Sequence, residues 1–158
     1  MKKFLLSILV LCSSKTQLLA HCQVPCGIYN DVTRIISIME DFKTIEKAMT
    51  KIVELAKAPE PTSKNQMVRW VYTKDEHATN IQNTVTSYFM TQRLKESNTN
   101  YSDQLTLLHK ILVTSMVCKQ TVEQKNPKHG LELINSFSKI YLDKHGAKHL
   151  KELTGIGR

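Results

Sequence analysis

Apolar residues recur at steps of three and four along most of this chain, which is the spacing of amphipathic helices. The first stripe runs through residues 31–58, with Asp31 expected as its N-cap, and two prolines within residues 59–63 then break the helix. The stripe consists of Ile35, Met39, Phe42, Ile45, Met49, Ile52 and Ala56. One continuous stripe predicts one helix that buries a single face.

The same spacing predicts two more helices in the middle of the chain. The second covers residues 65–95, with Trp70 in the core, and residues 96–102 form a polar connection. The third begins at Asp103 as an N-cap and is ended by the segment 126–130, which contains Pro and Gly.

A fourth helix completes the pattern. It follows residue 130 and closes at Gly146, a residue suited to a C-cap. No alternating strand pattern of useful length appears. The sequence therefore predicts an all-α fold: an antiparallel up-and-down four-helix bundle over residues 31–146, followed by a C-terminal tail at 147–158 that begins helical and frays at its end.

The first twenty residues have the layout of a cleaved leader. Lys2 and Lys3 precede a short apolar run, and the segment ends with a small residue, Ala20. The apolar run is too short to span a bilayer, so no stable membrane anchor is expected after processing. The expected destination is periplasmic or extracellular. The alternatives are an uncleaved N-terminal helix, or a propeptide that leaves the protein in the cytoplasm.

Composition adds few constraints. A chain of 158 residues with 41% apolar content fits one globular domain with a real core. The formal charge is +8, but no basic run is interleaved with aromatic residues, so nucleic-acid binding is not expected. Lys74 and Arg93 are candidates for steering an anion, although a solvated surface position is the simpler interpretation.

The segment 21–30, directly after the leader, carries the chemistry. Cleavage after Ala20 would make His21 the N-terminus, adding an amine to its imidazole, while Cys22 and Cys26 supply thiolates. Two nitrogens and two sulfurs in one plane suit a square-planar ion, Ni(II) or Cu(II), better than tetrahedral zinc. The alternative without a metal is a disulfide between the two cysteines, since disulfides are common in exported proteins.

The residues of this segment resemble one family specifically. His21, Cys22, Pro25, Cys26, Gly27 and Tyr29 at a processed N-terminus before a four-helix bundle closely resemble the N-terminal hook of nickel superoxide dismutase. The resemblance implies conversion of superoxide to dioxygen and hydrogen peroxide by Ni(II)/Ni(III) cycling, which protects against oxidative damage. It also implies one nickel ion per subunit and a homohexamer.

The resemblance implies roles for particular residues. The ligands would be the amine and imidazole of His21, the amide nitrogen and thiolate of Cys22, and the thiolate of Cys26. Tyr29 would stand over the open face of the metal, and Tyr88 would be a second pocket tyrosine.

The residues around the ligands match less closely. Gln23 replaces the Asp of some family members, and Pro25 shapes the hook. His77 stands near the position of an Arg that supports the axial histidine in the family, and no acid occupies the corresponding Glu position near Ile36. A packed histidine without a supporting role is an equal alternative for His77. Cys118 is expected to be a buried, inert thiol.

Two other function classes stay open from the residues alone. One is a non-catalytic exported bundle that binds nickel or copper through the same N-terminus. The other is an interaction module pinned by a disulfide between Cys22 and Cys26.

Overall fold

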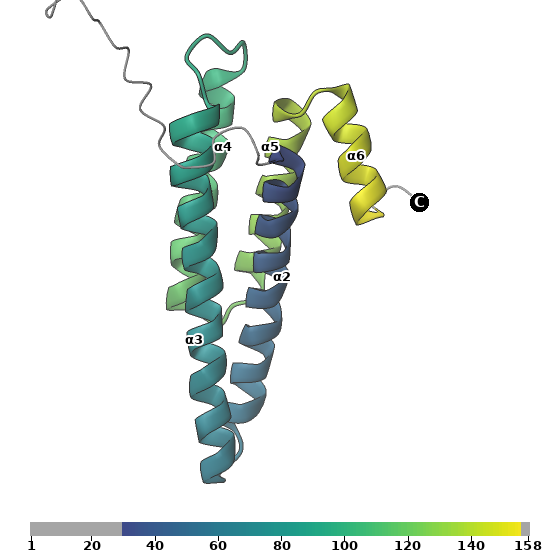
Figure 1. Cartoon of the computed structure of the whole chain (residues 1–158). Helices are drawn as coiled ribbons and strands as arrows, with labels where there is room; N and C mark the ends of the chain where they lie inside the picture. Colours follow the sequence, from purple (N-terminus) through teal and green to yellow (C-terminus); the bar gives the residue numbers. More distant parts are fainter. Residues whose placement is uncertain (1–29, 156–158) are drawn as a thin grey trace, which may run out of the picture.

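The computed structural model describes residues 30–155, and this part of the chain is helical throughout, without strands. Five α-helices and one π-helical segment follow one another along the sequence (Figure 1). They are α2 (Asp31–Ala56), α3 (Pro61–Asn83), η1 (Thr84–Arg93), α4 (Tyr101–Gln120), α5 (Lys125–Tyr141) and α6 (Lys144–Thr154).

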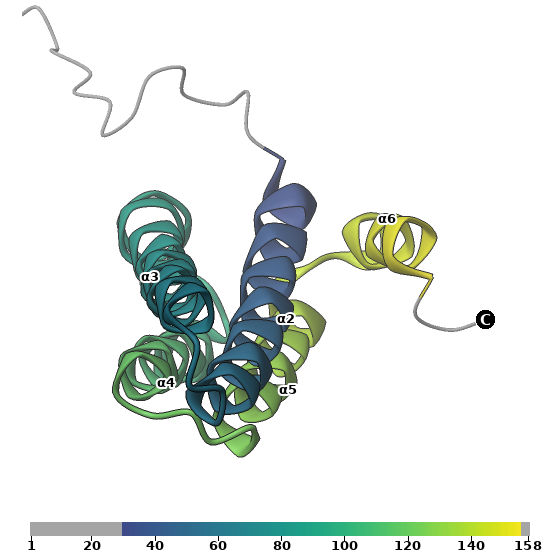
Figure 2. The same cartoon turned by 90° about the horizontal axis from the view of Figure 1, so that it is seen from below.

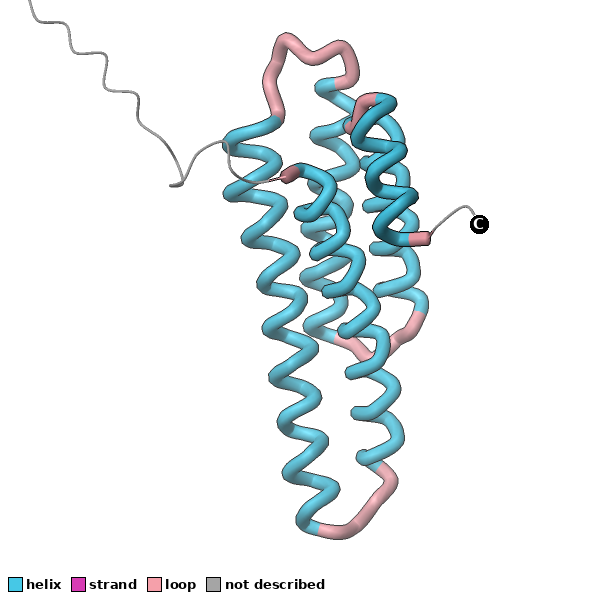
Figure 3. The backbone as a smooth tube through the Cα atoms, turned by 45° about the vertical axis from the view of Figure 1, so that its right-hand side comes forward, coloured by secondary structure: helices cyan, strands magenta, loops and turns pink. Residues whose placement is uncertain are grey.

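Helices α2 to α5 form the predicted antiparallel four-helix bundle. Each contacts its two neighbours in the cyclic order α2, α3, α4 and α5, which the view along the bundle shows directly (Figure 2). Segment η1 continues α3 to the end of the bundle, and α2 and α3 extend beyond the other two helices at the opposite end (Figure 3). The fold class predicted from the apolar stripes is confirmed.

The core lies along the bundle axis and is richest in aromatic rings where η1 meets α5. Phe89 packs edge to face against Phe137 and Tyr141, with ring centroids 5.2 and 5.5 Å apart. A close approach between α2 and α5 is made possible by Gly130, because a Cβ there would lie within 2.6 Å of three ring carbons of Phe42. The largest fully buried side chains are Phe42, Phe89, Phe137, Ile35, Ile38, Ile45, Met49, Ile81, Leu108, Ile111, Ile134 and Val85.

Two helix starts differ from the prediction by one or two residues. Asn30, not Asp31, caps α2, and its Oδ1 accepts a hydrogen bond from the amide of Val32 at 2.8 Å. Helix α4 begins at Tyr101, so Asp103 lies in the first turn and not at the cap. An acidic residue stabilises either position through the helix dipole, which is why the pattern did not separate them.

The second half of the chain departs further from the prediction. Helix α4 already ends at Gln120, and Pro127 and Gly130 lie inside α5. Proline is tolerated in the first turn of a helix, where its missing N–H would have no intrahelical partner. The segment 126–130 therefore belongs to a helix and does not break one.

The C-terminal segment forms a fifth α-helix outside the bundle. Helix α5 ends at Tyr141, and Gly146 is not its C-cap, since the Gly146 amide donates to the N-cap of α6, Asp143 Oδ1, at 2.7 Å. Helix α6 lies beside α2, buries Leu150, and ends at Gly155, whose φ of 67° is the left-handed conformation that glycine favours. The helical start expected for the tail therefore belongs to α6, which continues to Thr154.

One predicted core residue lies elsewhere. Trp70 is only partly buried on α3 and does not belong to the buried cluster, because α2 and α3 extend past α4 and α5 at this level. Within the described residues, no helix combines the length and the apolarity needed to cross a bilayer.

Candidate metal centre

The predicted metal ligands precede the first described helix. His21, Cys22 and Cys26 lie outside the described residues, as do Gln23, Pro25 and Tyr29. Among residues 30–155 there is no group of three or more His, Cys, Asp or Glu side chains that could hold a metal ion. The described part of the site is therefore the end of the bundle at which the hook sequence joins α2.

The junction itself is held by several side chains. Asp31, the first residue of α2, accepts hydrogen bonds from the Tyr88 hydroxyl at Oδ1 and from the Tyr141 hydroxyl at Oδ2, the latter at 2.9 Å. Arg93 Nε lies 3.1 Å from the same Oδ1, and Arg93 Nη2 donates to the Tyr88 oxygen at 2.9 Å. We call Asp31, Tyr88, Arg93 and Tyr141 the junction network.

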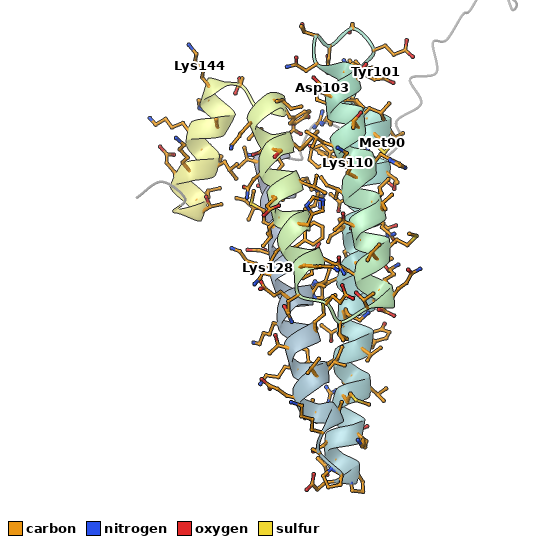
Figure 4. The ribbon with its side chains drawn as sticks, turned by 180° about the vertical axis from the view of Figure 1, so that it is seen from behind. Met90, Tyr101, Asp103, Lys110, Lys128 and Lys144 are labelled. Atoms are coloured by element: carbon orange, nitrogen blue, oxygen red, sulfur yellow. The ribbon has the colours of Figure 1, made fainter. Side chains whose placement is uncertain are left out.

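The network draws on three separate elements. Asp31 comes from α2, Tyr88 and Arg93 from η1, and Tyr141 from the last residue of α5. The side-chain view shows Tyr101 and Asp103 of α4 at this same end, with Lys144 where α6 begins (Figure 4). The helices α2, α4 and α5 and the segment η1 therefore each have an end near the place where the hook sequence joins α2.

Charge within the network keeps both phenols protonated. Burial raises the pKa of Tyr88, the hydrogen bond to Asp31 raises it further, and Arg93 lowers it in part. Burial and the Asp31 carboxylate also raise the pKa of Tyr141 well above that of a free tyrosine. At neutral pH the carboxylate of Asp31 therefore faces two neutral hydroxyl donors and one guanidinium.

Aromatic and cationic contacts hold the Tyr88 ring as well as its hydroxyl. The ring packs edge to face against Phe89 at 5.1 Å between centroids. The guanidinium carbons of Arg93 and Arg34 lie 4.9 and 5.6 Å from the centroid of the Tyr88 ring. The Tyr88 side chain is only 2% exposed.

An open cavity of about 500 Å³ adjoins the network. Asn30, Asp31, Arg93 and Tyr141 line one side, and α6 supplies His145 and His149 on the other. The cavity thus lies at the residue where the hook sequence ends, and α6, which the sequence did not predict as a helix, forms part of its wall.

His77 lies farther along the bundle. Its Nδ1 is 2.6 Å from Oδ1 of Asp41, a buried residue of α2, and the two form a hydrogen-bonded pair. Asp41 follows Asp31 by ten residues, which is about 15 Å of helix rise. The structure therefore gives His77 a partner within the bundle and does not bring it into the junction network.

Neither proposed anion-steering cation is a solvated surface residue. Lys74 is 3% exposed, and its Nζ donates to the carbonyl oxygens of Cys118 at 2.8 Å and Lys119 at 2.5 Å, at the end of α4. Arg93 is held in the junction network. Cys118 is fully buried as predicted, and burial raises the pKa of its thiol to about 11, so it stays protonated and unreactive.

Asp31, Arg93 and Tyr141 were missed as members of the site. Asp31 was assigned only as a helix cap, Arg93 was considered only for steering an anion, and no role was predicted for Tyr141. The spacing of Tyr88 and Arg93, five residues apart, places them on different faces of an α-helix, so only knowledge of the π-helical segment would have joined them.

Comparison with known proteins agrees with the chemistry of the N-terminal donors. The family model for nickel-containing superoxide dismutase matches residues 16–145, well over half of the chain and including the entire hook sequence. No curated protein and no solved structure gives a significant match. The imidazole of His21 and the thiolates of Cys22 and Cys26, within six residues, are also donors that suit nickel. The chain therefore belongs to the nickel-containing superoxide dismutase family and is an oxidoreductase of the nickel type.

Proposed function

We propose that cleavage after Ala20 makes His21 the N-terminal residue, and that the hook 21–30 then binds one nickel ion per chain. The ligands are the amine and imidazole of His21, the amide nitrogen and thiolate of Cys22, and the thiolate of Cys26. Bound nickel would supply the alternation between Ni(II) and Ni(III) that superoxide dismutation requires. Two superoxide anions and two protons then yield one dioxygen and one hydrogen peroxide.

The location of Tyr88 is the observation that carries this proposal. The family resemblance selected Tyr88, a residue of η1, as a pocket residue, and its hydroxyl binds Asp31, the residue that follows the hook. Cys26 precedes Asp31 by five residues, so even a fully extended chain keeps it within roughly 18 Å. The short chain between them thus keeps Cys26 within reach of the end of the bundle that holds Tyr88, which supports the proposal.

The remaining residues have supporting roles in this proposal. Tyr29 and Tyr88 restrict access to the metal, while Gln23 and Pro25 shape the hook. His77 would support the imidazole of His21 only if the hook extends along α2 toward the pair of His77 and Asp41. Dismutation by this protein would protect its surroundings from oxidative damage.

Assembly and export complete the proposal. Val68 and Tyr72, four residues apart on α3, are 63% and 69% exposed, and such apolar side chains favour burial against further copies of the chain. A homohexamer is the assembly that the family resemblance supports. The leader supports a periplasmic or extracellular destination.

The decisive experiment combines the mass of the N-terminus with metal content. Protein purified from its source should begin at His21, contain about one nickel per chain, and consume superoxide. Cys22→Ser and Cys26→Ser should lose nickel and activity while keeping their helical circular dichroism. Cys118→Ser is the matched control, since this buried thiol lies outside the hook, and it should retain both.

Three results would overturn the proposal. A chain that begins upstream of His21 would lack the amine ligand. Full nickel content without dismutation would indicate a metal carrier. A mass two units lower than that of the dithiol, with no bound metal, would indicate a disulfide between Cys22 and Cys26.

A further inference from the structure

Segment η1 brings together two side chains that an α-helix would separate. Its hydrogen bonds reach five residues back, as from the Leu94 amide to the Phe89 carbonyl at 2.8 Å. In an α-helix, residues five apart point roughly 140° away from each other. With the wider π-helical turn, Tyr88 and Arg93 lie one turn apart and both reach Asp31. Such π-helical segments are rare and occur frequently at functional sites.

The hydrogen bonds fix the direction of the Tyr88 hydroxyl. A phenol has one proton to donate and two lone pairs that accept. The proton is donated to Asp31, and Arg93 donates to the oxygen. Any further partner of this oxygen must therefore be a donor. Tyr141 occupies the second oxygen of Asp31, which stops the carboxylate from turning away.

We propose that Asp31 and Arg93 are positioning residues that hold the Tyr88 hydroxyl with its proton toward Asp31, so that Tyr88 acts in the site as an oriented hydrogen-bond acceptor and not as a proton donor. The inference rests on the proposed function in so far as the site is the nickel hook. Tyr88 would then orient a water molecule or the protonated product, and the protons of hydrogen peroxide would come from another source.

The charges around Tyr88 make the inference testable without nickel. Asp31 and Arg34 face it from α2, Arg93 from η1 and Tyr141 from α5, while Asp143, His145 and His149 of α6 line the adjoining cavity. Because Asp31 raises the pKa of Tyr88 and Arg93 lowers it, removing the two charges should shift that pKa in opposite directions.

The test is a titration of the five tyrosines by NMR, with the full chain labelled at tyrosine Cζ and no nickel added. Tyr88→Phe assigns the Tyr88 signal. Asp31→Asn should lower the pKa of Tyr88 relative to wild type, whereas Arg93→Gln should raise it and Arg93→Lys should restore most of the wild-type value. Tyr72→Phe is the control, because this exposed tyrosine of α3 lies outside the junction network and its loss should leave the titration of Tyr88 unchanged.

A second measurement covers the case in which the protein unfolds before Tyr88 titrates. At neutral pH the hydroxyl proton between Tyr88 and Asp31 should give a downfield resonance that is lost in Tyr88→Phe and in Asp31→Asn. The inference would be overturned if this resonance were absent in wild type, or if the titration of Tyr88 were unchanged in both Asp31→Asn and Arg93→Gln. The junction network would then serve only to stabilise the fold.

The nickel-loaded enzyme supplies the functional readout. Asp31→Asn should lower turnover roughly tenfold at unchanged nickel content, the scale typical of residues that orient a metal site from outside. Arg93→Lys should recover more activity than Arg93→Gln. If no nickel is bound, the proposed function fails but the titration result stands; if only the titration fails, nickel binding and dismutation are unaffected.

Discussion

Gly130 of α5 packs closely against the ring of Phe42 on α2. Alanine is normally a better helix former than glycine by about 1 kcal/mol. Here its Cβ would lie within 2.6 Å of three Phe42 ring carbons, so the ring or the helix must move. We expect Gly130→Ala to lower the free energy of unfolding by about 1–3 kcal/mol, measured by urea denaturation.

Gly146→Ala is the control for this substitution. It is also a helical glycine, but the nearest atoms to an added Cβ are the side chain of Leu142 at 3.2 Å and Asp143 Oδ1 at 3.3 Å. Its stability should stay close to wild type. A Gly130→Ala protein as stable as Gly146→Ala would show that α2 and α5 are not closely packed at Phe42.

Asp41 makes stability depend on pH in the acid range. Burial raises the pKa of its carboxyl above 3.8, and His77 offsets this only in part. The native state therefore binds a proton more tightly than the unfolded chain, and this contribution to stability is lost as pH rises through the raised pKa. The stability of the wild-type protein relative to Asp41→Asn should therefore be greatest below pH 3.8 and fall as pH rises through the raised pKa.

Chemical denaturation of both proteins across this pH range measures the effect. Asp143→Asn, at the exposed cap of α6, is a comparison in which no burial of the carboxylate is involved. If the stability of wild type relative to Asp41→Asn increased with rising pH, the raised pKa of Asp41 would be contradicted.

For single residues, the sequence predicted which side chains are buried better than it predicted which side chains they bind. The burial of Cys118 and of the α2 stripe from Ile35 to Ile52 was correct because apolar side chains follow the helical period, whereas Ala56 at the end of that stripe is exposed. The partners of Asp31 and His77 were not predictable, since they come from helices far apart in sequence. Trp70 was misplaced because periodicity shows which face is apolar but not how far the neighbouring helices extend.

Among whole elements, α3 and α4 are joined by a buried lysine. The ammonium of Lys74 takes the place of water at the last carbonyl groups of α4, where a positive charge also suits the helix dipole, and it lies 3.0 Å from Asp75. Lys74→Met would leave these carbonyl groups unsatisfied. We expect a loss of about 1–3 kcal/mol in unfolding free energy.

Hydrogen exchange locates the effect of this substitution. Amides at the end of α4 should exchange faster in Lys74→Met than in wild type, while Lys110→Met, at an exposed position of the same helix (Figure 4), should leave both exchange and stability nearly unchanged. If Lys74→Met and Lys110→Met showed the same stability and the same amide exchange, Lys74 would not cap the end of α4.

The helix number within the bundle was predictable, but the ends and the hydrogen-bonding pattern were not. Amphipathic stripes define α2 to α5, whereas Pro127 and Gly130 resemble a break and are accommodated by a first turn and by Phe42. Nothing in the composition of residues 84–93 distinguishes a π-helical segment from the continuation of α3. Its existence depends on the tertiary contacts of Tyr88 and Arg93.

For the whole molecule, α6 is an addition to a closed bundle. The family match ends at residue 145, and Leu150 is the one buried residue of this helix. Leu150→Ala should therefore cost about 2 kcal/mol, nearly as much as truncation after Leu142, and both proteins should remain folded bundles. Leu153→Ala, at a position 56% exposed, is the control and should be close to neutral.

Urea denaturation of these variants gives the comparison. Global loss of helicity in the truncated chain would show instead that α6 is required for the bundle to fold. For the hook, the sequence predicts which groups would bind the metal but not their arrangement in space. Its ligands lie outside the described residues, and its proposed function depends on a new N-terminus.

The fixed position of Asp31 also sets the local concentration of the proposed ligands near Tyr88. Three helices fix this residue, and the proposed ligands are joined to it through ten residues or fewer of the same chain. For a reactive group on so short a tether, the effective concentration at its target is in the millimolar range. Dilution of the protein would therefore not separate the metal from Tyr88, and their encounter would follow first-order kinetics.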